Sequence, residues 1–124
     1  PIRFHGLIHN NMVKMFSLTP DEMRQGEGLM TRIEHFDTAR LESAKANLRG
    51  VDVLGLHDAV EAFCDELAER FSWRLGASVR ANRTEPFSVP SSFRARIAAD
   101  NAADVELYNY ARTLCAQRHQ AMSR

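Results

Sequence analysis

The sequence predicts a predominantly helical α/β protein of about five helices with one or two short strands. Two observations predict this class. Residues 44–58 read as the end of a helix, a glycine, a short apolar strand, a second glycine and a new helix start, an order found in α/β cores. Residues 58–71 repeat apolar side chains at helical spacing. Because few other stretches read as strands, we expect this chain to be a fragment of a larger fold.

Length and composition favour one soluble globular domain, residues 1–124. Hydrophobic residues make up 44% and charged residues 26%, which is ordinary for that class. Sixteen basic residues balance sixteen acidic ones, so bulk charge indicates no nucleic-acid partner. The sequence contains no run of about 18 apolar residues, the length that would predict a membrane span. A cytoplasmic setting is the default expectation, since both cysteines are interpreted as free thiols.

The N-terminal third carries one strong helix start. Residues 2–16 space their apolar side chains as one helix would. Thr19 then stands as a cap, Pro20 as the first helical residue and Glu22 three residues after the cap, which together predict a capping box. The chain begins with Pro1 and lacks the apolar core of a signal peptide, so we expect a processed or excised N-terminus.

The middle of the chain contains the predicted strand. A helix is expected from about residue 38 to 49, with Gly50 as its stop. Val51–Leu54 is apolar and β-branched, which at this length favours a buried, parallel-type strand. We expect this solitary strand to pair with a second copy or to be covered by helices.

The amphipathic helix after it has the clearest periodicity in the sequence. It is expected over residues 58–71, with Asp58 and Glu61 as a capping-box-like pair. Its apolar positions are Val60, Phe63, Cys64, Leu67, Ala68 and Phe71.

The last third is expected to hold a second short strand at Ser78–Asn82 and two helices. An irregular loop with two prolines follows that strand. Ser91 or Ser92 then caps a helix ending near residue 100, and a final helix spans about residues 103–122.

Motifs for metal binding or catalysis are missing from the sequence. His5 and His9 share a face if helical, but a zinc site needs further ligands and no suitable partner motif accompanies them. Both cysteines fall within helical apolar patterns and are interpreted as buried free thiols. The chain has no phosphate-binding glycine loop and no nucleophile signature, so no catalytic or metal-binding residue is assigned.

Arg80 and Arg83 are the candidate anion-binding residues. They lie at the end of the second predicted strand and in its loop, and such loops are where open α/β sheets bind ligands. The arginine fork suits phosphate and sulfate. A solvated loop is the open alternative.

Several segments, taken in order, resemble one enzyme family: sulfotransferases that use 3′-phosphoadenosine 5′-phosphosulfate, in the branch like heparan-sulfate 2-O-sulfotransferase and its bacterial homologues. The resemblance covers about residues 10–115 of this chain and the C-terminal half of the family. The segments that carry it are Asn10–Phe16, Ala44–Gly55, Phe63–Trp73, Val79–Arg83 and Asn101–Tyr108.

The resemblance implies a fold like the C-terminal part of a P-loop-type sulfotransferase and transfer of a sulfuryl group to a hydroxyl acceptor such as a sugar or small metabolite. It implies that Arg80 and Arg83 contact the cofactor, and that Asn11 and Lys14 lie on the acceptor side. The family's phosphate-binding loop and catalytic base do not occur in this sequence, so the chain alone is expected to be inactive.

A non-enzymatic function is the alternative. The chain would then be a helical module that binds a protein partner or self-associates through apolar helix faces. Under the enzyme hypothesis the expected partners are a missing N-terminal half or a second copy.

Overall fold

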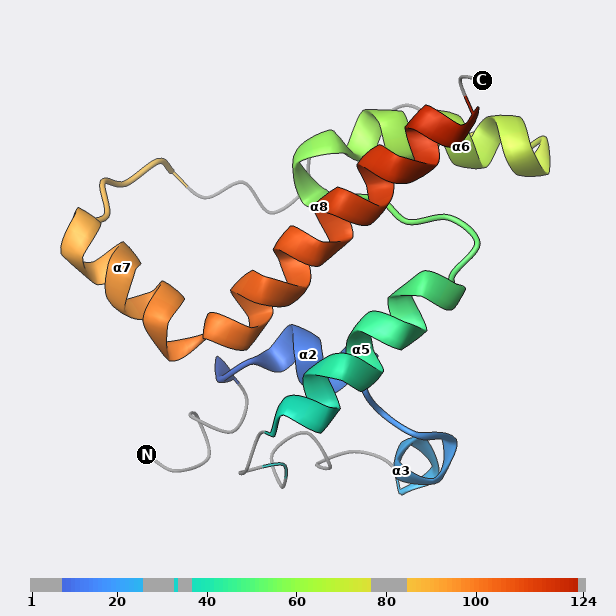
Figure 1. Ribbon diagram of the computed structural model, residues 1–124. Coiled ribbons are helices and arrows are strands. Elements are labelled where there is room, and N and C mark those ends of the chain that lie inside the picture. Colours follow the sequence, from blue (N-terminus) through green and yellow to red (C-terminus); the bar gives the residue numbers. More distant parts are fainter. Residues whose placement is uncertain (1–7, 26–32, 34–36, 77–84, 123–124) are drawn as a thin grey trace.

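The computed structural model describes residues 8–25, 33, 37–76 and 85–122, and in these ranges the chain is predominantly helical (Figure 1). No strand occurs in the described ranges. The helices, in chain order, are α2 (Asn11–Phe16), α3 (Pro20–Arg24), α5 (Thr38–Gly50), a 3₁₀ turn η1 (His57–Ala59), α6 (Val60–Phe71), α7 (Ser91–Asp100) and α8 (Ala102–Met122).

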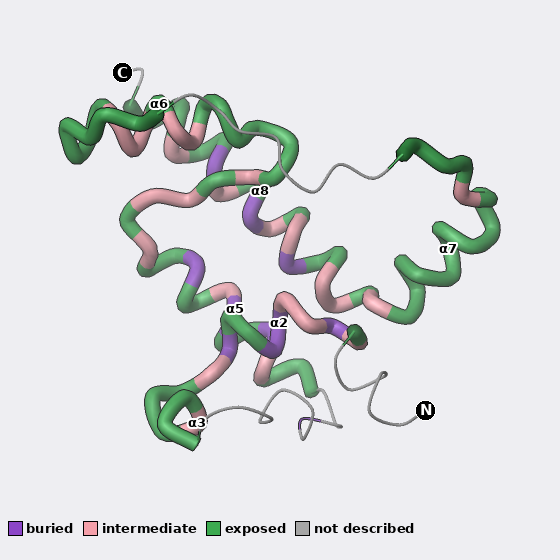
Figure 2. Tube along the Cα trace, turned by 180° about the vertical axis from the view of Figure 1, so that it is seen from behind, coloured by how far each residue is buried: buried purple, intermediate pink, exposed green. Residues whose placement is uncertain are grey.

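Three helices build the core. The long α8 runs across the molecule, and α5 and α2 pack against its first half, where the buried segments gather (Figures 1 and 2). The buried side chains of this cluster are Val13 from α2, Leu41, Ala44 and Leu48 from α5, and Leu107 and Ala111 from α8. Burial of these apolar surfaces is what holds the three helices together.

The helix expected over residues 2–16 is interrupted at residues 9 and 10, and α2 begins at Asn11. Residues 1–7 lie outside the described ranges. Asn10 takes a left-handed backbone conformation, with φ of 46°, which ends helical propagation toward the N-terminus. Asparagine tolerates that conformation better than most residues. The prediction of one continuous helix was therefore wrong at this residue.

The helix start at Thr19 is confirmed. The Thr19 hydroxyl accepts a hydrogen bond from the Glu22 backbone N–H at 3.2 Å, and the Glu22 carboxylate accepts one from the Thr19 N–H at 2.8 Å. Pro20 is the first residue of α3. Local sequence suffices here because both capping partners lie within one turn.

The strand predicted at Val51–Leu54 is absent; the segment is irregular. Side chains, rather than a neighbouring strand, satisfy its carbonyl groups. Arg70 Nη1 donates to the Asp52 carbonyl at 2.8 Å, and Cys115 Sγ donates to the Leu54 carbonyl at 3.4 Å. Since no strand forms here, the expected pairing or covering of a strand does not arise, and the segment is only partly buried. Gly50, expected as the helix stop, is instead the last residue of α5.

Helix α6 follows the predicted periodicity but not the predicted cap. The 3₁₀ turn η1 occupies residues 57–59, α6 begins at Val60, and no side chain caps it. The capping pair Asp58 and Glu61 was therefore wrong, because the 3₁₀ turn moves the helix start past Asp58. None of the α6 side chains is fully buried.

Helices α7 and α8 occur close to their predicted bounds. Pro90, not a serine, occupies the N-cap position of α7, and Ser91 and Ser92 lie inside the helix. α7 extends from the start of α8 as a separate arm that is exposed along its whole length (Figure 2). The second predicted strand, Ser78–Asn82, lies outside the described ranges. Within those ranges, no helix combines the length and apolarity needed to cross a membrane.

Candidate functional site

Helix α2 carries the two predicted acceptor-side residues, and α8 fixes its position. The Asp104 carboxylate accepts hydrogen bonds from the backbone N–H groups of Met12 at 3.1 Å and Val13 at 2.8 Å. In return, the Asn10 side-chain oxygen accepts from the Asp104 N–H at 3.1 Å. Asn101 Oδ1 accepts from the Asn10 N–H at 2.8 Å. These bonds satisfy backbone donors that a helix N-terminus leaves open.

Lys14 is among the most deeply buried side chains of the protein, with 1% of its surface exposed. Burial lowers the pKa of its amine below the usual 10.5, because the charged form loses solvation. The Asp104 carboxylate opposes this by raising the pKa, and the nearby Arg40 guanidinium lowers it further. A buried lysine of this kind is a candidate functional group.

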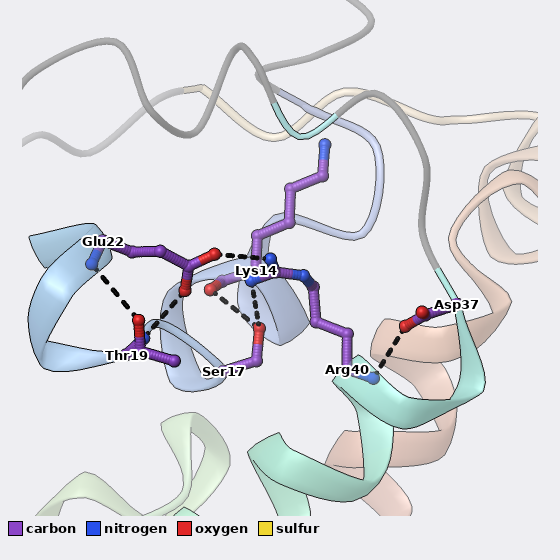
Figure 3. Close-up of polar contacts among 6 residues, drawn as sticks. All are labelled: Lys14, Ser17, Thr19, Glu22, Asp37 and Arg40. Carbon is purple, nitrogen blue, oxygen red and sulfur yellow. Dashed lines mark hydrogen bonds and ion pairs between the residues drawn. The ribbon is translucent and has the colours of Figure 1, made fainter. Parts of the chain in front are cut away.

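Arg40 links α5 to the α2–α3 corner beside Lys14 (Figure 3). Its Nη2 donates to Glu22 Oε1 at 2.7 Å and its Nη1 donates to Ser17 Oγ at 3.2 Å. The Arg40 hydrogen bond, aided by the Thr19 backbone N–H, lowers the pKa of the Glu22 carboxyl to about 2. Glu22 therefore stays ionised at neutral pH and holds Arg40 in place.

The charged residues around α2, called here the Lys14 cluster, are two cations, Lys14 and Arg40, and two anions, Glu22 and Asp104. Within it the Lys14 side chain extends away from the Arg40–Glu22 ion pair (Figure 3). Such a balanced set does not suit a polyanionic nucleotide, which needs excess positive charge or free backbone N–H donors. A neutral polar group does not require such an excess of positive charge.

Asn11 and Lys14 behave differently although both lie on α2. The Asn11 side chain is half-buried, and its Nδ2 lies 3.8 Å from Met15 Sδ, a weak contact at an exposed edge. Lys14 lies inside, next to Arg40. The structure therefore brings only Lys14 into the charged cluster just described.

Arg80 and Arg83, the predicted cofactor-binding residues, lie outside the described ranges, as does His5. His9 is half-buried beside Asn10, whose Nδ2 lies 3.2 Å from His9 Nε2. Across the described residues, no group of three or more histidine, cysteine or carboxylate side chains is arranged to hold a metal ion.

Arg40, Glu22 and Ser17 were not singled out from the sequence as site residues. Glu22 was recognised only as a cap, and Arg40 lies 18 residues further along the chain with no shared periodicity. Asp104 did carry a signal, since it belongs to the Asn101–Tyr108 segment on which the family resemblance partly rests.

No protein-family model matches this chain, and comparison with curated proteins and with solved structures gives no significant match.

Proposed function

We propose that this chain is the C-terminal region of a sulfotransferase that uses 3′-phosphoadenosine 5′-phosphosulfate, and that it helps to form the acceptor side of the active site. Asn11 and Lys14 of α2 would lie on the acceptor side, with the half-buried Asn11 the more accessible of the two. Arg80 and Arg83 would contact the nucleotide. When bound, the cofactor supplies the sulfuryl group that is transferred.

One observation carries the proposal: segments that resemble the family, although far apart in sequence, pack together. Asn10 at the start of α2 is hydrogen-bonded to Asn101 and Asp104 of the Asn101–Tyr108 segment. Ala44 and Leu48, from the Ala44–Gly55 segment, lie in the same buried cluster as Leu107. A common origin in one fold requires such packing.

The charge balance of the Lys14 cluster supports the division of roles. A cluster with two cations and two anions favours a neutral hydroxyl over a nucleotide that carries several phosphate charges. Anion binding is therefore assigned to the arginines of the residue 79–83 segment.

Titration calorimetry with adenosine 3′,5′-bisphosphate tests the nucleotide assignment. We expect saturable binding that weakens by about tenfold or more in Arg83→Ala and in Arg80→Ala, the loss typical of a charge-assisted phosphate contact. Arg96→Ala is the matched control, since Arg96 is a highly exposed arginine on α7. The reading frame upstream of Pro1 shows whether a longer protein should be titrated as well.

Binding that Arg83→Ala leaves unchanged would remove Arg83 from the site. If the longest protein encoded by this reading frame does not bind the nucleotide, the sulfotransferase proposal is wrong.

Binding of a protein partner, or self-association, is the second candidate function. It is favoured by the exposed apolar side chains on the helices outside the core. On and after α6 these are Val60, Phe71, Trp73 and Leu75, and before and on α7 they are Phe87, Phe93 and Ile97. Sedimentation analysis of the purified chain tests this function directly.

A further inference from the structure

We propose that α7 is a self-association element that pairs antiparallel, about a two-fold axis, with α7 of a second copy of this chain. The inference rests on the second candidate function and does not depend on sulfuryl transfer. Two independent properties of α7 carry it: an exposed apolar stripe beside a groove, and a distribution of charge that only an antiparallel partner makes favourable.

The apolar stripe lies along the arm that α7 forms. All ten residues of α7 are exposed, so none of its side chains is committed to the core. Phe93 and Ile97 lie four residues apart and therefore on one face, with 55% and 47% of their surfaces exposed. A groove of about 860 Å³ adjoins this face, between α7 and the start of α8. Its apolar lining comes from Ile8, Val89, Phe93, Ile97, Ala98 and Val105.

The charges of α7 oppose its own dipole. Arg94 lies in the N-terminal half, where the helix end is positive, Arg96 lies just past the middle, and Asp100 is the last residue, where the end is negative. The helix has no acidic residue in its first turn and no basic residue in its last. Within α7 itself only a long contact between Arg96 and Asp100, 3.7 Å, offsets this arrangement.

An antiparallel second copy of α7 brings favourable charges to both ends of the helix. Arg94 of one α7 then lies beside the C-terminal end and Asp100 of the other, and each Asp100 lies beside the N-terminal half and Arg94 of its partner. A two-fold interface repeats every such contact, which is how closed homodimers form. Phe93 and Ile97 of the two copies then cover each other. This self-complementarity is why we assign a second copy to the face.

Arg94 is available for such a contact. In the described part of the chain it forms no ion pair, and its Nε only approaches the Val89 carbonyl, at 3.4 Å. The interface area offered by one short helix and its groove is at the small end for stable complexes, so a concentration-dependent dimer in the micromolar range is expected.

Sedimentation velocity of the 124-residue chain over increasing concentration tests the proposal. We expect a monomer–dimer equilibrium that weakens as salt is added. Two variants, Arg94→Glu/Arg96→Glu and Asp100→Arg, each place like charges opposite one another in a homodimer, so the dissociation constant of each should rise about tenfold or more. An equimolar mixture of the two variants restores opposite charges at both ends, and dimer should return.

Apolar variants with a matched control locate the surface. Phe93→Asp should abolish the dimer, whereas Phe71→Asp, on α6, should leave it intact. Circular dichroism checks that helix content is kept, which is expected because neither side chain is buried. A chain that stays monomeric at every concentration, a dimer lost in Phe71→Asp but not in Phe93→Asp, or a mixture that fails to dimerise would each overturn the proposal. Nucleotide binding is measured separately, so either proposal can fail alone.

Discussion

Asn10 and Asp104 each accept hydrogen bonds from backbone N–H groups at the start of the helix to which the other belongs. The Asp104 carboxylate accepts from the N–H groups of the first turn of α2, and the Asn10 amide oxygen accepts from the Asp104 N–H in the first turn of α8. The two residues are 94 positions apart. This reciprocal capping fixes where α2, and with it Lys14, lies relative to α8.

Removing the Asp104 carboxylate should therefore destabilise the fold. Asp104→Ala leaves the N–H groups of Met12 and Val13 without an acceptor, and we expect a loss of about 1–3 kcal/mol in the free energy of unfolding. Urea denaturation measures this loss. Asp65→Ala, an exposed aspartate on α6, is the control and should change the free energy by less than about 0.5 kcal/mol.

A double-mutant cycle with Asn10→Gly tests the reciprocity itself. Glycine keeps the left-handed backbone conformation of residue 10 but removes the capping oxygen. We expect the double variant to be more stable than the sum of the two single losses in free energy predicts. The loss of either cap loosens the contact between α2 and α8, and this already weakens the hydrogen bonds of the other cap. Simple additivity would show that the two caps act independently.

The ion pair of Glu22 with Arg40 should make stability depend on pH in the acid range. The pKa of Glu22 falls from 4.5 to about 2 on folding, so its contribution is fully present above pH 4.5 and is lost as pH falls toward 2. We expect the wild type to exceed Glu22→Gln by about 1 kcal/mol near neutral pH, with this difference shrinking over that acid interval. Urea midpoints at several pH values measure it, and Glu61→Gln, exposed on α6, should show no such trend.

The two lysines of the chain should show opposite trends at high pH. Burial lowers the pKa of Lys14, so the cost of its buried charge disappears as pH rises from that lowered pKa to 10.5, and the wild type should gain stability relative to Lys14→Met. Hydrogen bonds with Glu106 and Glu42 raise the pKa of Lys45. The wild type should therefore lose stability relative to Lys45→Met as pH rises through 10.5 and above.

Comparison with each methionine variant isolates the lysine, because the other groups that titrate in this range are common to all three proteins. Equal slopes for both variants would contradict the burial of Lys14.

Gly55 should be intolerant of a side chain. A Cβ atom at this residue would overlap the Phe63 ring, so Gly55→Ala must displace the first turns of α6 and should cost about 1–3 kcal/mol. Thermal and urea unfolding measure this cost. Gly50→Ala is the matched control, because the space around Gly50 is open and its helical backbone favours alanine. The control should be neutral or stabilising by up to about 1 kcal/mol.

The sequence predicts those elements whose signals are local. Thr19, Pro20 and Glu22 place the start of α3, because both capping partners lie within one turn. Helices α6 and α8 follow from apolar residues at helical spacing.

Non-local relationships could not be predicted in the same way. Val51–Leu54 has the composition of a strand, but a strand requires a neighbour, and Arg70 and Cys115 bind its carbonyl groups instead. The contact of Arg40 with Glu22 joins two helices without a common periodicity. Of the predicted site residues, Lys14 is buried, Asn11 is half-buried on the same helix, and Arg80 and Arg83 fall outside the described ranges.

The reciprocal capping of Asn10 and Asp104 also has a consequence for the order of folding. α2 has six residues, too few to persist as an isolated helix in water. Its closing bonds come from a segment more than 90 residues later, so α2 gains them only after the start of α8 has formed. α5 and α8 must assemble first, and the segment that carries Lys14 is completed last.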